Sequence, residues 1–345
     1  MTLQVRTLDD ASAPAWDAFV DAMPEGSFFH RAAWAHVIRA AFGHRTFFTF
    51  TERDGAITGV LPLAQVKTLL FGNTLVSTPF CVYGGVLAAD ADSAAALEAH
   101  AAGLLQSTGA GALELRDRTP AAPGGDWVRR PDLYVTFRKP IEADNERNMK
   151  AIPRKQRAMV RKGIQHGLTS VCDRNAAVLH RAYAESVRNL GTPVFSRRYF
   201  DVLLEAFGDA VDIVTVLDEG RPIASVMNFY FRDEVLPYYG GGTAAARHRA
   251  GNDFMYWEVM RRAAERGFRL FDFGRSKVGT GAHAFKRNWG FTPAPLPYRY
   301  KLAPGAAIPD HNPLNPKYRL FIAAWKRLPL PVANLLGPPI VRGLG

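Results

Sequence analysis

Residues 271–291 read FDFGRSKVGTGAHAFKRNWGF and combine three local patterns that bear on the fold. An apolar, strand-like run that begins at Phe268 enters a loop with three glycines, and a helix-like segment follows from about Ala282. A strand, a glycine-rich loop and a helix in this order are typical of a phosphate-binding corner, because the first N–H groups of the helix point at the ligand. The remainder of the chain decides which kind of corner this is.

The nucleotide-binding P-loop has the spacing G-x-x-x-x-G-K-[ST]. Gly274 and Gly279 supply the glycines, but Thr280 stands where the lysine is required and Gly281 where the magnesium-binding hydroxyl is required. The segment is therefore not a P-loop. The sequence also contains no G-x-G-x-x-G, G-x-S-x-G or H-E-x-x-H, and its nine histidines show no metal-ligand spacing, so we expect no metal site.

The composition is that of a globular protein with a basic surface. The chain has 345 residues, 48% of them apolar, which is enough for two domains, and a formal net charge of +11 that favours polyanionic partners. Two distant cysteines, Cys81 and Cys172, give no disulfide framework or zinc spacing. The N-terminus has no apolar signal segment, and no apolar run approaches the ~20 residues of a spanning helix. We expect a cytoplasmic protein whose contact with the inner face of the membrane is at most peripheral.

One order of elements occurs twice along the chain. Two hairpins are centred on Asp54-Gly55 and Glu219-Gly220, and each is followed by a third strand that ends in Tyr-Gly-Gly, at residues 83–85 and 239–241. A helix and a further strand follow in both copies, with the helices expected at 93–107 and 252–266. We interpret this order as a tandem duplication of one α/β unit.

The repeated unit resembles the GNAT acyltransferase fold, in which the third strand separates from its neighbour and opens a wedge for the acyl donor. Pro237 in the third strand of the second copy predicts a sheet edge or a bulge. We expect an α+β protein of two tandem GNAT-like domains, each a mixed, mostly antiparallel sheet flanked by helices. The expected domains are residues 1–140 and 148–303, the second ending in the strand PLPYRYKL, and a basic, proline-rich tail follows at 304–345.

The segment PYYGGGTAAARHRAGNDFMYWEVMRRAAERGFRLFDFGRSK, residues 237–277, together with FKRNWGF, is similar to the C-terminal signature of the FemAB-like family. Its members are tandem-GNAT aminoacyl and acyl transferases of the bacterial cell envelope. The chain most resembles the branch associated with exopolysaccharide and exosortase (PEP-CTERM) loci. In the family, a lysine in the context F-K-x-x-(x)-G-F lies close to the reacting carbonyl, and the matching residue here is Lys286.

The resemblance and the pattern together suggest a site at the end of the FRLFDF strand, because ligands of open α/β sheets gather at the carboxyl ends of strands. Lys286 would stabilise an oxyanion or a donor phosphate, with an ordinary surface lysine of a helix as the alternative. Asp272 would orient a base or the incoming amine, or it would cap a loop. Tyr239 is a candidate proton relay, with core packing as the alternative. The expected donor-binding residues are Arg247, Arg249, Arg275, Lys277, Gly240 and Gly241.

The donor itself stays open. The coenzyme A loop of GNAT proteins reads [QR]-x-x-G-x-[GA], but Ala250 and Asn252 occupy its small-residue positions here. We expect no tightly bound cofactor, and either an acyl-CoA or an aminoacyl-tRNA as co-substrate.

A second basic feature lies at the start of the second copy. One stripe of a predicted helix contains Arg154, Arg157 and Arg161. The stripe is either a docking surface for a polyanion, such as the acceptor, or an ordinary solvated helix face. The tail is expected to lie on anionic lipid or to pack on the protein.

The function expected from these features is N-acyl transfer from an activated donor to an amine of a cell-envelope or exopolysaccharide precursor, such as a lipid-linked glycan. The N-terminal copy would be a scaffold or bind the acceptor. The alternative is a non-catalytic module on a degenerate acyltransferase fold that binds RNA, tRNA among them, or anionic polysaccharide.

Overall fold

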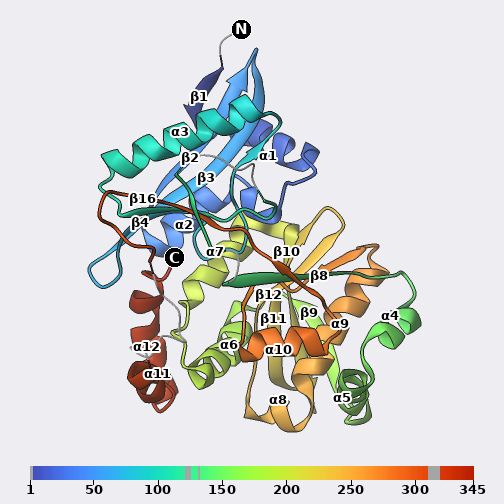
Figure 1. The fold of residues 1–345 in the computed structure, drawn as a ribbon. Coiled ribbons are helices and arrows are strands. Elements are labelled where there is room, and N and C mark those ends of the chain that lie inside the picture. Colours follow the sequence, from blue (N-terminus) through green and yellow to red (C-terminus); the bar gives the residue numbers. More distant parts are fainter. Residues whose placement is uncertain (1–2, 121–125, 131–132, 310–318) are drawn as a thin grey trace. The chain divides into compact units, whose positions relative to one another are not determined.

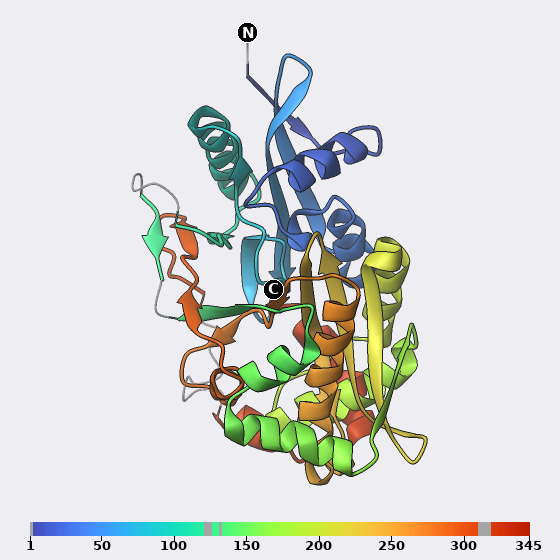
Figure 2. The same ribbon diagram turned by 90° about the vertical axis from the view of Figure 1, so that its right-hand side faces the viewer.

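The computed structural model describes residues 3–120, 126–130, 133–309 and 319–345 (Figures 1 and 2). The chain forms two compact units, and each unit is assembled from separate stretches of sequence. Unit 1 comprises Met1–Leu133, Pro295–His311 and Arg342–Gly345, and unit 2 comprises Tyr134–Ala294 and Asn312–Val341.

Unit 1 is built on a sheet with the strand order β1-β2-β3-β4-β6-β16-β7, and β5 pairs with β3. Its strands and main helices are β1 (Gln4–Thr7), α1 (Ala13–Ala22), α2 (Trp34–Phe42), β2 (Arg45–Arg53), β3 (Ala56–Thr68), β4 (Gly72–Ser77), β5 (Leu87–Ala88), α3 (Ala91–Ser107), β6 (Ala112–Leu115), β7 (Val128–Arg129) and β16 (Arg299–Leu302). The β2–β3 hairpin turns at Asp54-Gly55, where both residues have positive φ, as a tight two-residue turn requires.

Unit 2 contains a sheet with the order β14-β8-β13-β12-β11-β10-β9, and β15 pairs with β8. Helices cover both faces of this sheet (Figures 1 and 2). Its elements are β8 (Tyr134–Pro140), α4 (Asn145–Ala151), α5 (Arg154–Gln165), β9 (Thr169–Asp173), α6 (Ala176–Leu190), α7 (Arg197–Phe207), β10 (Val211–Asp218), β11 (Arg221–Phe231), β12 (Glu234–Gly242), α8 (Ala244–His248), α9 (Gly251–Glu265), β13 (Leu270–Asp272), β14 (Ser276–Lys277), α10 (Gly281–Asn288), β15 (Pro293–Pro295), α11 (Arg319–Trp325) and α12 (Leu330–Val341).

The duplication inferred from the sequence is present in the two sheets. Each sheet contains a hairpin and a third, antiparallel strand, after which the chain passes through a helix to a strand that pairs in parallel with the third one. These parallel pairs are β4 with β6 in unit 1 and β12 with β13 in unit 2. The expected fold class, two tandem GNAT-like domains with mostly antiparallel sheets, is confirmed.

The two units exchange one strand each, which the sequence did not predict. β16, expected as the last strand of the second domain, pairs with β6 of unit 1, and β8, expected in the first domain, pairs with β13 of unit 2. The structure therefore divides the chain after Leu133 and after Ala294 rather than at the expected boundaries. A local apolar pattern does not say which distant sheet edge a strand completes.

The tail contains two helices. Leu330 of α12 packs against Ala184, Val187 and Val194 of unit 2, and the carbonyl oxygen of Gly345 accepts a hydrogen bond from Arg116 in unit 1. Part of the expected tail, residues 310–318, lies outside the described residues. Among the helices of the described ranges, none is both long and apolar enough to cross a bilayer.

Candidate functional site

The strands β12 and β13 of unit 2 run side by side for a short distance only. They pair in parallel at Glu234 with Leu270 and at Val235 with Phe271, after which β13 ends at Asp272 while β12 continues to Gly242. In an extended strand, alternate N–H groups point to opposite sides. Beyond Val235, the N–H groups of β12 that point away from β11 therefore face the side on which β13 no longer pairs with β12.

A bulge in β12 accompanies this separation. Met227 of β11 pairs with Tyr239 and the next residue, Asn228, pairs with Pro237, so Tyr238 is the extra residue. A proline cannot donate to a strand ladder, and a bulge accommodates it. The sequence-based prediction of an edge or bulge at Pro237 is therefore confirmed as a bulge.

Asp272 lies at the end of β13 and is buried, with 1% of its surface exposed. Its Oδ1 accepts a hydrogen bond of 2.6 Å from the N–H of Gly274, and its Oδ2 lies 3.3 Å from Nε of Arg138 on β8. Arg138 also binds Glu234 at the start of β12. The carboxylate is thus fixed by the loop that follows it and by an arginine from the neighbouring strand.

Lys286 on α10 points at the same loop. Its Nζ donates to the carbonyl oxygens of Gly274 at 3.1 Å and Arg275 at 2.9 Å, and it lies 5.5 Å from the ring centroid of Phe137. The residue as a whole is only half-buried, but its ammonium is directed inward. The pKa of Lys286 is lowered to about 7, chiefly by burial; the charge of Asp272 opposes the change, and Arg275 contributes a smaller lowering effect.

The other basic residues of this loop lie against β8. The guanidinium of Arg275 is 4.5 Å and the ammonium of Lys277 is 5.5 Å from the ring centroid of Tyr134. The structure therefore brings together four of the predicted residues, Asp272, Arg275, Lys277 and Lys286, around the end of β13.

Tyr239 lies elsewhere. Its hydroxyl is 2.7 Å from that of Tyr199, and its ring contacts a cluster of aromatic side chains that includes Tyr183 and Phe200 on α6 and α7. Lys286 instead donates to the loop after β13, so the two residues have different hydrogen-bond partners. The packing alternative describes the environment of this tyrosine.

The remaining predicted donor residues have distinct surroundings. Arg249 binds both carboxylate oxygens of Asp218, at 2.9 and 2.7 Å, whereas Arg247 is exposed on α8. Gly241 allows α6 to approach β12, because a Cβ atom there would lie 2.6 Å from Cβ of Ser186. At Gly240, a Cβ atom would lie 2.9 Å from a methyl group of Val226.

The basic stripe of α5 borders a surface hollow of about 370 Å³, which is lined by Arg154, Arg157, Ala158, Arg161 and Gln165. The opposite face of the helix packs on α9, where Gly163 approaches Phe254 closely. Asp253 of α9 connects this helix to the end of α10, because it accepts hydrogen bonds from Gln156 of α5 and from the indole of Trp289.

The contribution of β8 to this region is absent from the sequence-based prediction. Tyr134, Phe137 and Arg138 all contact residues of the predicted site, yet they precede the expected domain boundary. One signal could have found Arg138: the second exchanged strand also carries an arginine, Arg299, directly after an aromatic residue.

Two comparisons with known proteins agree with this architecture. Residues 148–287 match the family model described as acetyltransferase (GNAT) domain. A search of the curated proteins finds no match.

Among solved structures, the crystal structure of FemX matches with a TM-score of 0.68 at 15% identity, covering 92% of this chain and 100% of that one. A tandem GNAT protein from the clavulanic acid biosynthesis pathway matches with a TM-score of 0.54 at 15% identity, covering 89% and 100% of the two chains. L-PGS from Bacillus licheniformis matches with a TM-score of 0.54 at 14% identity, covering 91% and 97%. At such identities the likeness concerns the fold.

The family match spans the part of unit 2 that runs from the end of α4 to Lys286 and Arg287 on α10. The separated strands, the bulge and the loop after β13 all lie within it. Residues 148–287 thus form an acetyltransferase (GNAT) domain within a tandem GNAT-like fold, and the enzyme is an acyltransferase.

Proposed function

We propose that the chain is an N-acyltransferase of the FemAB-like type, which moves an acyl or aminoacyl group from an activated donor to an amine of a cell-envelope or exopolysaccharide precursor. The observation that carries the proposal is the position of the Lys286 ammonium beside the end of β13, where β12 and β13 have separated. The fold similarity to FemX and to a tandem GNAT protein supports the reaction class.

Lys286 is suited to stabilise the oxyanion of the tetrahedral intermediate. An ammonium has three N–H donors, and two of them are directed at the carbonyl oxygens of Gly274 and Arg275. The third can meet the oxygen of the donor carbonyl as negative charge develops on it. Such a donor, held in place before reaction, stabilises the transition state more than the ground state.

Asp272 and Arg138 act through Lys286 in this proposal. The buried carboxylate favours the charged form of the lysine, which burial alone would neutralise at neutral pH. Arg138 fixes the orientation of that carboxylate. We therefore regard both as positioning residues. Tyr239 is assigned to packing, because its hydroxyl is bonded to Tyr199 within an aromatic cluster.

The donor is an acyl-CoA or an aminoacyl-tRNA, and both carry phosphates. GNAT domains use acyl-CoA, which favours the first. Lys277 and Arg275 on the loop, with the exposed Arg247 on α8, would meet the anionic part of the donor, whereas Arg249 is engaged by Asp218. The hollow beside Arg154, Arg157 and Arg161 would take a phosphate of the acceptor or of tRNA.

Donor consumption tests the proposal directly. The purified protein is incubated with acetyl-CoA, longer acyl-CoAs and charged tRNA, with envelope-glycan extracts as acceptor, and the donors are followed by mass spectrometry. We expect one donor class to be consumed only when acceptor is present. If RNA or anionic polysaccharide binds tightly while no donor binds or is consumed, the chain is a binding module instead.

A further inference from the structure

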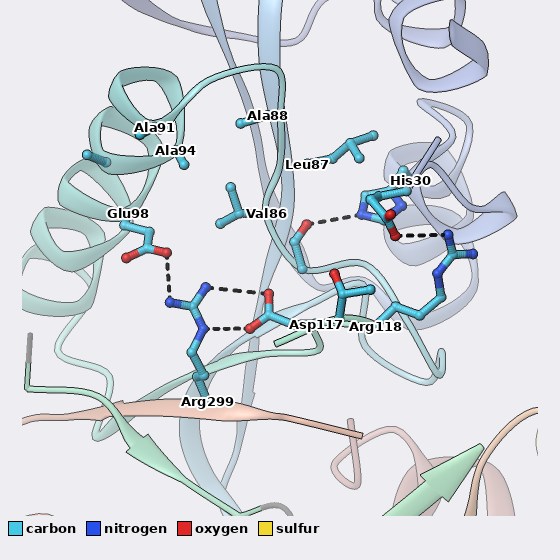
Figure 3. Close-up of a pocket in the computed structure, with 14 residues that line it drawn as sticks. His30, Val86, Leu87, Ala88, Ala91, Ala94, Glu98, Asp117, Arg118 and Arg299 are labelled. Atoms are coloured by element: carbon cyan, nitrogen blue, oxygen red, sulfur yellow. Dashed lines mark hydrogen bonds and ion pairs between the residues drawn. The ribbon is translucent and has the colours of Figure 1, made fainter. Parts of the chain in front are cut away.

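Unit 1 contains a pocket of about 410 Å³ that the proposed reaction does not use (Figure 3). Its walls are the segment Gly85–Ala88, the first turns of α3, the chain just after β6 and one side chain of β16. Figure 3 shows Glu98, Asp117 and Arg299 together on one side and the small side chains of Ala91 and Ala94 above them. All of its lining residues belong to unit 1.

The pocket occupies the place in the repeat that corresponds to the site of unit 2. In both units, an aspartate stands at or just after the end of the parallel strand and binds an arginine of the exchanged strand. In unit 1 these residues are Asp117 and Arg299, with Nε of the arginine 2.6 Å from Oδ2 of the aspartate. The Tyr-Gly-Gly segment of the repeat also borders the pocket, through Gly85.

A charged network forms one wall. Arg299 is buried, with 4% of its side chain exposed, and its Nη1 lies 2.8 Å from Glu98, whose side chain remains 25% exposed. Arg118 lies 3.4 Å from Glu25. Three carboxylates thus face two guanidinium groups.

His30 does not change the net charge of the pocket lining. Its Nε2 is 3.1 Å from the carbonyl oxygen of Gly85, which can only accept, so Nε2 carries the hydrogen and Nδ1 accepts from the hydroxyl of Ser27 at 2.8 Å. Burial lowers the pKa of His30 to about 4, and the ring is neutral at pH 7. Burial raises the pKa of Asp117, and the hydrogen bonds and charge of Arg299 oppose this change. With Asp117 ionised, the three carboxylates and two guanidinium groups give the lining one excess negative charge.

The N-terminus of α3, which adjoins the pocket, disfavours the binding of a phosphate there. Asp90 caps α3, with Oδ1 accepting from the N–H of Ser93 at 2.8 Å, and Asp92 stands in the first turn. In unit 2, the segment before α9 carries Arg247 and Arg249, and the first turn of α9 also contains Asp253. Arg53 lies 3.1 Å from Asp90 and 4.0 Å from Asp92, so the three side chains together leave one excess negative charge beside the pocket. This charge favours a cation over a phosphorylated ligand.

We propose that this pocket of unit 1 binds a small organic amine in its protonated form, with the ammonium at Glu98 and Asp117 and the carbon framework against the wall formed by Val86, Ala88 and Ala94. The volume is at the lower end for small-molecule sites and corresponds to a single amino sugar or amino acid. The carboxylates are already oriented by Arg299, so the ligand finds acceptors in place. An acceptor amine is one ligand of this class, but the inference does not depend on transfer at unit 2.

Calorimetric titration of the full chain tests the site with matched pairs of probes. The pairs are glucosamine with N-acetylglucosamine and lysine with Nα,Nε-diacetyl-lysine, and glucose 6-phosphate serves as an anionic probe. We expect at least one free amine to bind with a dissociation constant below about 10 mM, and its acetylated counterpart to bind at least tenfold more weakly. If neither amine binds, if acetylation makes no difference, or if glucose 6-phosphate binds best, the proposal is overturned.

Three variants locate the binding within the molecule. Glu98→Gln removes one carboxylate and should weaken amine binding about tenfold. Ala94→Leu fills the pocket from the exposed side of α3 and should abolish binding while the thermal transition stays unchanged. Lys286→Met alters only unit 2 and should bind the amine as the wild type does. Unchanged binding by Ala94→Leu, or loss of binding in Lys286→Met, would place the amine elsewhere.

Discussion

Arg138 on β8 and Arg299 on β16 have the same role in different sheets. Each lies on the strand that its unit receives from the other half of the sequence, and each binds a buried aspartate at the end of the parallel strand, Asp272 and Asp117 respectively. The duplicated unit has kept this ion pair in both copies, although the catalytic proposal involves only one of them.

Removal of Arg138 should destabilise unit 2. Arg138→Met leaves the carboxylate of Asp272 buried without its guanidinium, and breaking a buried pair by removing one partner typically costs on the order of 3 kcal/mol. Urea denaturation measures the change in the free energy of unfolding. Arg147→Met, which removes a guanidinium from exposed ion pairs, is the control and should stay within about 0.5 kcal/mol of the wild type. Equal effects of the two variants would mean that the Arg138–Asp272 pair contributes no more than an exposed one.

Loss of the Lys286 ammonium should abolish most activity. Lys286→Met cannot donate to an oxyanion, and removal of one such donor typically lowers turnover on the order of a hundredfold or more. Steady-state kinetics with the identified donor and acceptor give kcat and KM separately. Arg287→Met, at the next and exposed position of α10, should keep wild-type turnover. Lys277→Ala should mainly raise KM for the donor. Wild-type turnover in Lys286→Met would place the reaction elsewhere.

The role of Lys286 should be visible in the pH dependence of the reaction. If the ammonium stabilises the oxyanion, its contribution is present below its pKa and is lost as pH rises through about 7. The titration of the acceptor amine affects the wild type and Lys286→Met alike. The kcat of the wild type divided by the kcat of Lys286→Met therefore reports the contribution of the lysine alone. We expect this ratio to fall between pH 6 and about 8. A ratio that rises with pH would indicate that the neutral lysine acts as a general base.

The same residue links stability to pH. The pKa of Lys286 is about 7 in the folded protein against 10.5 for the ordinary side chain, so between these values the unfolded chain holds a proton that the folded protein has released. Unfolding free energy therefore rises with pH in this window, by at most about 1.4 kcal/mol per pH unit. Urea denaturation from pH 7 to 9.5 should show the wild type gaining stability relative to Lys286→Met. Parallel curves would show that the lysine titrates normally.

The stripe on α5 should serve binding rather than folding. Arg154→Ala, Arg157→Ala and Arg161→Ala together remove like charges from an exposed helix face, and such substitutions usually change stability by no more than about 0.5 kcal/mol each. The triple variant should bind tRNA or a phosphorylated substrate more weakly, with a smaller dependence of affinity on salt concentration. Filter binding between 50 and 300 mM salt measures both. A large drop in melting temperature with unchanged affinity would show that the stripe is structural.

The sequence predicts the elements of this protein better than their pairing partners. The turns at Asp54-Gly55 and Glu219-Gly220 follow from local geometry, and Asp272, Arg275 and Lys286 come together because one short strand-loop-helix segment carries them all. Arg138 comes from a strand more than a hundred residues earlier, and no local pattern assigns that strand to the second sheet. The donor role expected of Arg249 rested on charge alone, which gives no sign that Asp218 binds it.

The strand exchange also bears on how this protein is made. When the ribosome has completed the first repeat, the edge of β6 is still bare, since Arg299 and its strand are encoded 182 residues after Asp117. The nascent N-terminal half therefore has an open sheet edge, of the kind that favours aggregation, until β16 has been synthesised. A gene cut between the repeats would produce two halves that each carry the strand the other needs. Neither copy is a complete domain by itself, because each sheet is completed by a strand from the other half of the sequence.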